Sequence, residues 1–395
     1  MRIIYNIVIR FYILYIRIAS FFNSKAKLWL IGRKNILRKI KHATKNEKDI
    51  VWFHCASLGE FEQGRPIIDG YKQKYPEHKI FLTFFSPSAY EVSRHYKNAD
   101  WIFYLPADTT KNAKQFITTL KPIKVIFIKY DFWFNYMFEL KSKNIPLYFV
   151  SSIFRETQSF FKCKWFAKQL NNVTHFFIQD TNSQKLLNKI GIKQVSVSGD
   201  SRFDRVRENS KNPRNIPLID NFTNTRKTLI AGSTWPKDEK FLKQFIKVNH
   251  QYNYIIAPHK IEQCNILAKQ INGLLYSKAT TKNINKSNVL IIDRIGLLSS
   301  IYQHGTFSYI GGGFGTGIHN ILEPAAFDVP IVFGPHYQKF NEAKELIELG
   351  GAISITDTNE LSTAINHFSE NYKPETCRNY IESRCGSTKK ILEII

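Results

Sequence analysis

Acidic residues are missing from the start of this 395-residue chain, and no cysteine motif occurs anywhere in it. The first acidic residue is Glu47, whereas lysine and arginine recur throughout the stretch before it. The five cysteines form no C-x-x-C or C-x-x-x-C pair, which argues against a zinc site or a disulfide framework and indicates a reducing compartment. No cleavage site of the A-x-A kind follows the apolar N-terminus, so a removed signal peptide is not expected.

The charge balance indicates an anionic partner. The chain has 56 basic and 32 acidic residues, a net charge of +24, which suits either nucleic acid or anionic membrane lipids. No helix-turn-helix, zinc-finger or RNP motif is present, and the positive charge is concentrated beside an apolar N-terminal segment. We therefore expect anionic lipids and no nucleic acid as partners.

Residues 1–22 predict an interfacial helix. At about 100° per residue, one narrow sector collects the polar side chains Arg2, Asn6, Arg10, Arg17 and Ser20. Such a helix can lie at a bilayer surface with its arginines at lipid phosphates, and residues 25–45 add positive charge. A true span is disfavoured because mid-bilayer arginine is costly. A helix packed on the protein's own core is the alternative, and residues 1–46 form the predicted membrane-associated segment.

From Asp49 onward the pattern is α/β, and the length of the chain suggests two domains. Short apolar runs that end in Ser, Asp or Pro alternate with helix-like stretches, which is typical of parallel strands with crossover helices. The predicted strand regions are 49–57, 79–86, 101–108, 124–132, 145–153, 175–180, 195–200, 228–235, 252–260, 288–296, 307–315, 330–336 and 352–357.

The predicted architecture is two doubly wound, Rossmann-like domains that face a cleft, over residues 47–207 and 228–395. The polar stretch 208–227, with two prolines and several asparagines, is predicted to be the linker. Ligands are expected at the carboxyl ends of the strands.

The glycine-rich stretch 311–317 lies between a predicted strand, 306–310, and a predicted helix that begins near His319 or Asn320. Glycines allow close approach of a ligand, the helix start suits a phosphate, and Glu323 could accept hydrogen bonds from sugar hydroxyls. This combination predicts a nucleotide site, although a tight turn with a buried glutamate is the alternative. The pattern is not G-x-G-x-x-G with a later acid, so a nicotinamide cofactor is disfavoured.

Two other loops carry candidate groups. Ser233 and Thr234, in GSTWPKDE, could bind a phosphate. The alternative is that they only form an ordinary start of the next helix. Ser57 and Glu60, in HCASLGE, fit a capping box, and Glu60 could equally be a general base. The loops 84–91 and 129–136 follow two further strands of this domain, with Asp131 as a polar member.

Together these segments resemble the 3-deoxy-D-manno-octulosonic acid (Kdo) transferases of lipopolysaccharide assembly. HCASLGEFEQ is similar to that family's glycine–glutamate motif, and LTFFSPSAYE to its T-x-x-S-P-x-G block, with Ala89 in place of glycine. GDSRFD is similar to its G-N-x-K-[FY]-D block, and AGSTWPKDE to its G-S-T-H-x-G-E block. Residues 317–342 are close to its G-H-N-P-L-E-P…G-P-H…N-F signature. The matches keep their order from about residue 49 to residue 350.

The resemblance implies a GT-B glycosyltransferase without a metal or other cofactor. The donor would be CMP-Kdo, the acceptor a lipid A precursor (lipid IVA), and Glu60 the general base of an inverting transfer. The N-terminal segment would anchor the protein on the cytoplasmic face of the inner membrane. The candidate residues on the acceptor side are Ser57, Gly59, Ser86, Ser88, Asp131 and Arg202.

The resemblance also implies a donor site in the second domain. Its residues are Ser233, Thr234, Pro258, His259, Lys260, Ile295, Gly296, Leu297, Gly317, His319, Asn320, Ile321, Leu322 and Glu323. The family's usual arginine is His259 here, with Lys260 beside it, so one of these two must replace its charge. The asparagine and lysine of the G-N-x-K block are Asp200 and Arg202, and the glutamate after Gly296 is Leu297.

Three other functions stay open at this point. Another GT-B enzyme could use a UDP-sugar on a lipid-linked acceptor, with the same fold and glycine-rich loop. A nucleic-acid-binding protein would use the net charge alone. A peripheral membrane scaffold without activity would leave Glu60 dispensable.

Overall fold

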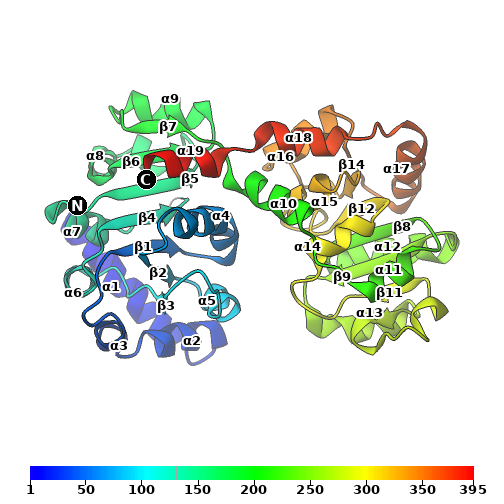
Figure 1. Cartoon of the computed structure of the whole chain (residues 1–395), viewed down its shortest axis with the longest axis horizontal. Helices are drawn as coiled ribbons and strands as arrows, with labels where there is room; N and C mark the ends of the chain where they lie inside the picture. Colours follow the sequence, from blue (N-terminus) through cyan, green and yellow to red (C-terminus); the bar gives the residue numbers. More distant parts are fainter. Residues whose placement is uncertain (130) are drawn as a thin grey trace. The chain divides into compact units, whose positions relative to one another are not determined.

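The computed structural model describes residues 1–129 and 131–395, which form two compact units (Figure 1). Unit 1 comprises Met1–Arg205 and Cys385–Ile395, and unit 2 comprises Val206–Arg384. Each unit contains one seven-stranded sheet in which every pairing is parallel. The predicted pair of doubly wound, Rossmann-like domains is therefore confirmed.

The sheet of unit 1 has the strand order β3-β2-β1-β4-β5-β6-β7. The direction of winding reverses between β1 and β4, and ligands of such sheets bind outside the carboxyl ends of the strands at this switch point. The strands are β1 (Ile50–Cys55), β2 (Lys79–Phe84), β3 (Trp101–Tyr104), β4 (Lys124–Ile128), β5 (Leu147–Ser152), β6 (His175–Ile178) and β7 (Val195–Val197). The predicted strand region 124–132 includes residue 130, which lies outside the described residues.

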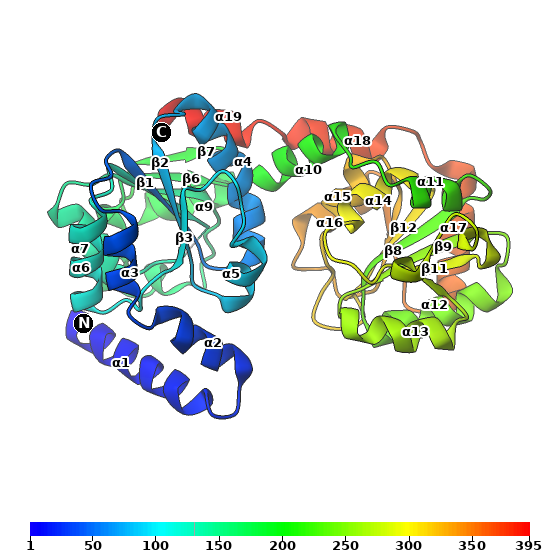
Figure 2. The same cartoon turned by 60° about the horizontal axis from the view of Figure 1, so that its bottom comes forward.

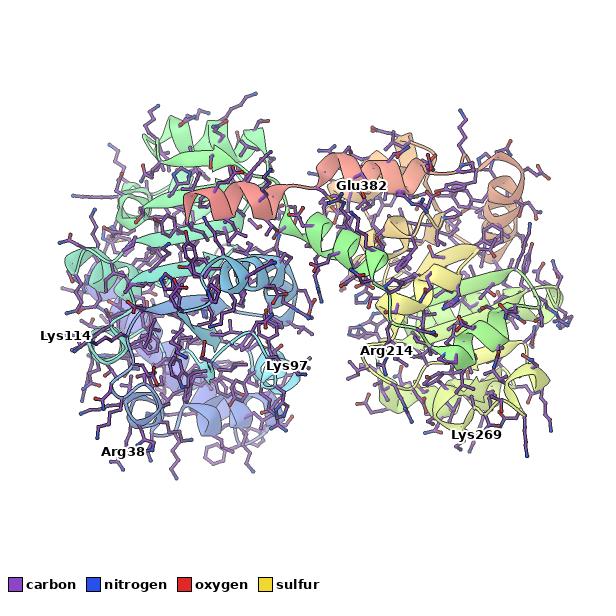
Figure 3. The ribbon with its side chains drawn as sticks, viewed as in Figure 1. Arg38, Lys97, Lys114, Arg214, Lys269 and Glu382 are labelled. Carbon is purple, nitrogen blue, oxygen red and sulfur yellow. The ribbon has the colours of Figure 1, made fainter. Side chains whose placement is uncertain are left out.

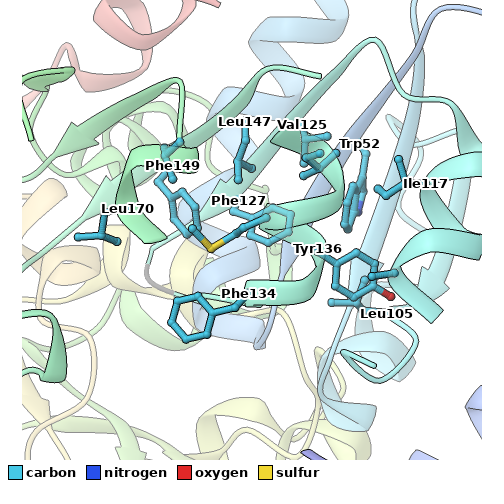
Figure 4. Close-up of a cluster of buried hydrophobic side chains, with 14 of the residues drawn as sticks. Trp52, Leu105, Ile117, Val125, Phe127, Phe134, Tyr136, Leu147, Phe149 and Leu170 are labelled. Carbon is cyan, nitrogen blue, oxygen red and sulfur yellow. The ribbon is translucent and has the colours of Figure 1, made fainter. Parts of the chain in front are cut away.

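Both faces of this sheet are covered, as the alternation of side chains along β1 shows. Trp52 packs into one hydrophobic cluster, whereas Val51 and Phe53 pack into the other. Figure 4 shows the first cluster, in which the Trp52 ring lies 5.1 Å from Phe127 and 5.5 Å from Tyr136. The helices of this unit are α3 (Ile36–Ala43), α4 (Leu58–Lys74), α5 (Pro87–Ser93), α6 (Thr110–Leu120), α7 (Phe134–Ser142), α8 (Lys164–Gln169), α9 (Thr181–Lys189) and α19 (Ser387–Ile394), with α1 and α2 described below.

Unit 2 repeats this plan with the order β10-β11-β9-β8-β12-β13-β14, and its switch point lies between β8 and β12. The strands are β8 (Thr228–Thr234), β9 (Asn253–Pro258), β10 (Leu274–Leu275), β11 (Val289–Ile291), β12 (Phe307–Ile310), β13 (Ile331–Phe333) and β14 (Ala352–Ser354). The helices are α11 (Pro217–Thr223), α12 (Pro236–Val248), α13 (Cys264–Gln270), α14 (Leu298–Ile301), α15 (Leu322–Ala326), α16 (Asn341–Glu348), α17 (Thr358–Asn371) and α18 (Thr376–Arg384). Only the two-residue strand β10 was not among the predicted strand regions.

The predicted end of the first domain at residue 207 lies two residues from the end of unit 1, whereas the predicted linker and start of the second domain differ from the structure. Unit 1 ends within α10 (Ser201–Lys211), and the predicted linker contains α11, whose Ile219 and Phe222 are buried. Pro217 occupies the first turn of that helix, where proline is tolerated. This proline therefore marks the start of a helix and not a loop.

The end of the chain returns to unit 1, where Asp204 accepts hydrogen bonds from Gly386 N and Thr388 N at 2.6 Å each. Ile391 packs in the same cluster as α4. The prediction that residues 385–395 belong to the second domain is therefore wrong. These residues belong to unit 1.

The N-terminal segment forms α1 (Arg2–Ala19) and α2 (Ser24–Arg33), which lie side by side at the edge of unit 1 (Figure 2). One face of α1 packs on the unit through Ile9 and Ile16, and the Tyr5 hydroxyl donates to Asp108 at 2.5 Å. The opposite face exposes the apolar side chains Ile3, Ile4, Ile7, Val8, Phe11, Leu14, Tyr15 and Ile18, followed by Phe21 and Phe22. The helix thus packs on the protein's own core and also carries an uncovered apolar face.

Within residues 1–129 and 131–395, no helix is by itself long and apolar enough to cross a bilayer. The pair α1 and α2 meets the length and composition criteria together, with a bend of 120° between the helices.

Candidate active site

Each unit brings polar side chains together at the carboxyl ends of the strands beside its switch point. In unit 1 the groups follow β1, β2 and β4, which are neighbours in the sheet. In unit 2 they follow β9, β8 and β12, which are also neighbours.

Glu60 in unit 1 takes part in a complete capping box at the start of α4. Ser57 Oγ accepts from Glu60 N at 3.4 Å, and Glu60 Oε2 accepts from Ala56 N at 2.5 Å and from Ser57 N at 3.2 Å. These bonds satisfy backbone donors that the helix itself cannot pair. The predicted capping box of Ser57 and Glu60 is therefore confirmed.

The surroundings of Glu60 favour its protonated form. The side chain is only 8% exposed, and burial, followed by the negative charge of Asp131, raises the pKa of Glu60 to about 7. The Ala56 and Ser57 amides and the Lys129 ammonium oppose this rise. A capping bond to backbone amides alone would lower the pKa of a carboxyl group. A carboxylate tuned close to neutral pH is suited to accept a proton in a reaction.

A second group of side chains lies beside Glu60. His54 is buried on β1, with Nδ1 2.8 Å from Thr83 Oγ1 and Nε2 3.3 Å from Asp131 Oδ2. Trp133 Nε1 donates to the same Asp131 oxygen at 3.0 Å. Asp131, predicted from the sequence, is thus fixed by two partners that the prediction did not include. The signal available for His54 was a polar residue at the end of an otherwise apolar strand.

The other predicted acceptor-side residues occupy different environments. Ser57 and Gly59 are exposed at the first turn of α4, and a Cβ at Gly59 would meet no atom within 4 Å. Ser86 begins α5, and its amide donates to Ala56 O at 2.8 Å, which joins the loops after β1 and β2. Ser88 is exposed.

Arg202 follows the edge strand β7 and is paired with Asp200 at 2.8 Å. Asp200 also accepts from Gln63 Nε2, on α4, at 2.7 Å. Arg202 is therefore held in an ion pair next to α4, one helical turn from Glu60 along that helix.

In unit 2, the glycine-rich loop packs against the protein's own backbone. A Cβ on Gly311 would lie 2.4 Å from Ser233 O, and a Cβ on Gly313 would lie 2.5 Å from Gly334 N. Gly312 and Gly317 have φ of +92° and +141°, where glycine is favoured. The glycines thus allow three loops to meet, which is a different use from the predicted close approach of a ligand.

The buried Asp238, which the sequence analysis did not single out, connects two of these loops. Its Oδ2 accepts from Gly312 N at 2.9 Å and from Trp235 N at 2.8 Å, and its Oδ1 accepts from Tyr309 Oη at 2.8 Å. Thr234 Oγ1 donates to the neighbouring Glu239 at 3.2 Å. The acids at the start of α12 therefore organise the strand ends.

Three aromatic rings stack beside this loop. The ring centroids of Trp235 and His259 are 4.5 Å apart with an angle of 20° between the rings, and those of His259 and His319 are 4.7 Å apart at 26°. Trp235 Nε1 donates to His319 Nε2 at 2.9 Å, and the Lys260 ammonium lies 5.5 Å from the centroid of the Trp235 ring. The predicted residues His259, Lys260 and His319 are thus brought together, with Trp235 as an additional member.

The remaining predicted donor-site residues lie at the carboxyl ends of β8 and β9 or in the segments after β11 and β12. Helix α15 begins at Leu322, because Asn320 Oδ1 accepts from Leu322 N at 3.2 Å and Asn320 Nδ2 donates to Glu323 Oε1 at 3.2 Å. The predicted helix after the glycine-rich loop is therefore present, and it begins two residues after Asn320. The side chains of Pro258, Leu297, Ile321 and Leu322 are buried, Thr234 is buried, Ser233 and Gly317 are half-buried, and Ile295 and Gly296 are exposed.

Basic side chains are spread over the surface of both units. Figure 3 shows Arg38 and Lys114 of unit 1 and Lys269 of unit 2 extending away from the ribbon. The positive charge therefore includes many solvated side chains besides those near the strand ends.

Comparison with known proteins identifies relatives of the chain. Residues 33–205 match the profile of the family described as 3-deoxy-D-manno-octulosonic-acid transferase (kdotransferase). A protein of that name from Aquifex aeolicus (strain VF5) is 28% identical over 333 residues, which cover 82% of this chain and 87% of the relative. Another from Rickettsia bellii (strain RML369-C) is 28% identical over 376 residues, which cover 90% and 88%.

Solved structures share the fold. A UDP-GlcNAc 2-epimerase from Neisseria meningitidis has a TM-score of 0.57 at 14% identity, with 87% of this chain and 98% of that chain covered. A glycosyltransferase from Rickettsia africae ESF-5 has a TM-score of 0.55 at 12% identity, with 88% and 98% covered. At these identities the likeness concerns the two-domain fold alone.

Proposed function

Because the chain belongs to the Kdo transferase family of glycosyltransferases, we propose that it transfers Kdo from CMP-Kdo to a lipid A precursor, lipid IVA. In this proposal unit 1 supplies the general base and the acceptor side, and unit 2 binds the donor nucleotide. No metal or other cofactor takes part. The alternatives of a UDP-sugar donor or a nucleic-acid partner gain no support from any contact described above.

The proposed reaction is an inverting displacement. A hydroxyl oxygen of the acceptor attacks the anomeric carbon of Kdo, and its proton moves to the Glu60 carboxylate. The bond between that carbon and the phosphate oxygen breaks, and CMP leaves with the electron pair from the opposite face. Positive groups and hydrogen-bond donors that face the leaving phosphate would stabilise its charge.

The environment of Glu60 is the single observation that carries this proposal. A residue that serves only as a helix cap would be expected in solvent or beside positive charge, whereas Glu60 is buried next to a second carboxylate, which raises its pKa to about 7. This arrangement costs folding free energy, and a base that must accept a proton near neutral pH gives a reason for it.

We also propose that the apolar face of α1 lies in the cytoplasmic surface of the inner membrane, where the lipid acceptor is found. The exposed apolar face and the two phenylalanines after the helix support this location, since an uncovered surface of this kind is typical of interfacial helices. Arg10 and Arg17 are exposed on the same helix and could reach anionic lipid phosphates.

A transfer assay tests the proposed reaction. Purified protein is given CMP-Kdo made in situ, or one of several UDP-sugars, together with a tetra-acylated lipid A precursor. We expect a Kdo-bearing product from CMP-Kdo alone, and the same rate after treatment with EDTA. Turnover of a UDP-sugar without use of CMP-Kdo would contradict the substrate assignment, and loss of activity in EDTA would contradict a metal-free reaction.

Sedimentation with vesicles that contain anionic lipid tests the location. Phe11 is 66% exposed and Phe22 91% exposed, and burial of one such side chain is worth about 1.5–3 kcal/mol. Phe11→Ser combined with Phe22→Ser should therefore weaken vesicle binding by about tenfold or more. The matched control is Val248→Ser in unit 2, where the side chain is 74% exposed. Equal binding by both variants would contradict the proposed role of α1.

A further inference from the structure

The ring stack of unit 2 stands at the switch point of the sheet. Trp235 follows β8, His259 follows β9, and His319 belongs to the loop after β12, and these three strands are adjacent. Anionic parts of ligands are commonly bound at such positions in doubly wound sheets. The protonation of the two imidazoles and the position of Lys260 therefore decide which charge this part of the site presents.

The hydrogen bond from Trp235 fixes the state of His319. An indole nitrogen can only donate, so His319 Nε2, at 2.9 Å, must accept and cannot carry a proton. The imidazole of His319 is therefore neutral, with its proton on Nδ1. Burial and the neighbouring His259 lower the pKa of His319, in agreement with this geometry, although Asp238 acts in the opposite direction.

His259 stacks on both other rings, which lie edge to edge with 6.3 Å between their centroids and 9° between their planes. Protonation would place a second positive charge next to the Lys260 ammonium, and burial together with Lys260 lowers the pKa of His259. Among residues 1–129 and 131–395, the groups that face this imidazole are Trp235, His319 and Lys260, and none of them is an acid that would favour its charged form.

Lys260 is the cation of this cluster. Its ammonium lies 5.5 Å from the centroid of the Trp235 ring, a distance at which the ring attracts and orients a positive charge. In the part of the chain outside residue 130, no carboxylate lies within 4.0 Å of this ammonium. The Lys260 ammonium is thus positioned by an aromatic ring, and none of these carboxylates neutralises its charge.

We propose that Lys260, and not His259, supplies the positive charge that receives the phosphate of the donor nucleotide, and that the Trp235–His259–His319 stack is its neutral platform. This inference rests on the proposed function, because it takes the ligand to be a cytidine nucleotide. It selects Lys260 from the two residues, His259 and Lys260, that could replace the charge of the family's arginine. A charge-assisted hydrogen bond from Lys260 to the phosphate would then contribute to affinity for the donor and to stabilisation of the leaving group.

Calorimetric titration of the full-length protein with CMP tests the assignment. We expect Lys260→Met to weaken binding by about tenfold or more, and Lys260→Arg to restore most of the loss. Lys269→Met is the matched control, since Lys269 is an exposed lysine on α13 of the same unit, and its removal should change the affinity by less than about twofold. If Lys260→Met binds CMP as well as Lys269→Met does, the proposal is wrong.

A second titration separates the two candidate cations by pH. The CMP affinities of His259→Asn and of the wild type are measured at about pH 6 and at about pH 8, and their ratio cancels the titration of the phosphate itself. If Lys260 and not His259 supplies the charge, removal of the imidazole should change the affinity by the same factor at both pH values. A ratio that is large at pH 6 and approaches one at pH 8 would assign the charge to His259. Failure of the proposed function is distinct, because the wild type would then bind UDP but not CMP.

Discussion

Replacement of Glu60 by glutamine is expected to stabilise unit 1 at alkaline pH while it abolishes transfer. Glutamine has the shape of glutamate and keeps an oxygen that can accept from Ala56 N and Ser57 N, so most of the capping box survives. It removes the negative charge that burial and Asp131 disfavour. The variant therefore separates the capping role from the catalytic role.

The magnitude follows from the pKa of Glu60, which rises from an ordinary 4.5 to about 7 in the folded protein. The folded state holds the proton more tightly than the unfolded state, so this carboxyl group contributes most to stability below pH 4.5. That contribution is lost as the pH rises through about 7, and the loss is about 3 kcal/mol in full. Between pH 5 and pH 8 it amounts to about 2–2.5 kcal/mol. The stability of Glu60→Gln relative to the wild type should therefore increase by this amount when the pH is raised from 5 to 8.

Urea unfolding at pH 5 and pH 8 measures the difference. Five of the six tryptophans belong to unit 1 (Trp29, Trp52, Trp101, Trp133 and Trp165), so fluorescence reports mainly on this unit, and circular dichroism reports on the whole chain.

Glu360→Gln is the matched control for this measurement. Glu360 is an exposed glutamate that accepts from Thr356 N at 2.6 Å, near the start of α17, and glutamine there should give the same change at both pH values. If Glu60→Gln is less stable than the wild type at pH 8 and remains active, Glu60 is a helix cap alone and the reasoning fails.

Three further results are expected. The kcat/KM for transfer should fall tenfold per pH unit below about pH 7, because Glu60 must be ionised to accept a proton, and a flat profile down to pH 5 would contradict this. Asp131→Asn removes a charge that raises the pKa of Glu60, so this acid limb should move to lower pH, and a move to higher pH would contradict the electrostatic argument. In Asp238→Asn, one side-chain oxygen remains for the donors that now share two. The free energy of unfolding, measured by thermal unfolding, should therefore fall by about 1–3 kcal/mol, and CMP binding should weaken. An unchanged Tm would mean that the bonds to Gly312 and Tyr309 contribute little.

The alternation of apolar runs was sufficient to predict the two sheets, because buried parallel strands are apolar on both faces. Strand β10 has only two residues, which is too short for any pattern to show. The predicted linker 208–227 belongs to unit 2 instead, because Pro217 starts a helix there that packs through Ile219 and Phe222, whereas prolines and asparagines are typical of loops. The return of residues 385–395 to unit 1 depends on contacts distant in sequence, and nothing local indicates it.

The candidate site was predicted in part. The capping box of Glu60 could be recognised from residue spacing, but its raised pKa could not, since that depends on Asp131 about seventy residues away. Asp238 looked like an ordinary acid at a helix start, and only the fold shows that it holds the glycine-rich loop. The stack of Trp235 with two histidines likewise requires three strand ends to meet, which no single stretch of sequence reveals.

The proposed role of Glu60 is tested most directly by measuring transfer and CMP binding on the same preparations of wild type and Glu60→Gln. The reaction contains CMP-Kdo and a tetra-acylated lipid A precursor at about pH 8, where Glu60 is ionised. We expect a Kdo-bearing product from the wild type, none from Glu60→Gln, and the same affinity of both for CMP. Equal rates for the two proteins would show that Glu60 is not the base.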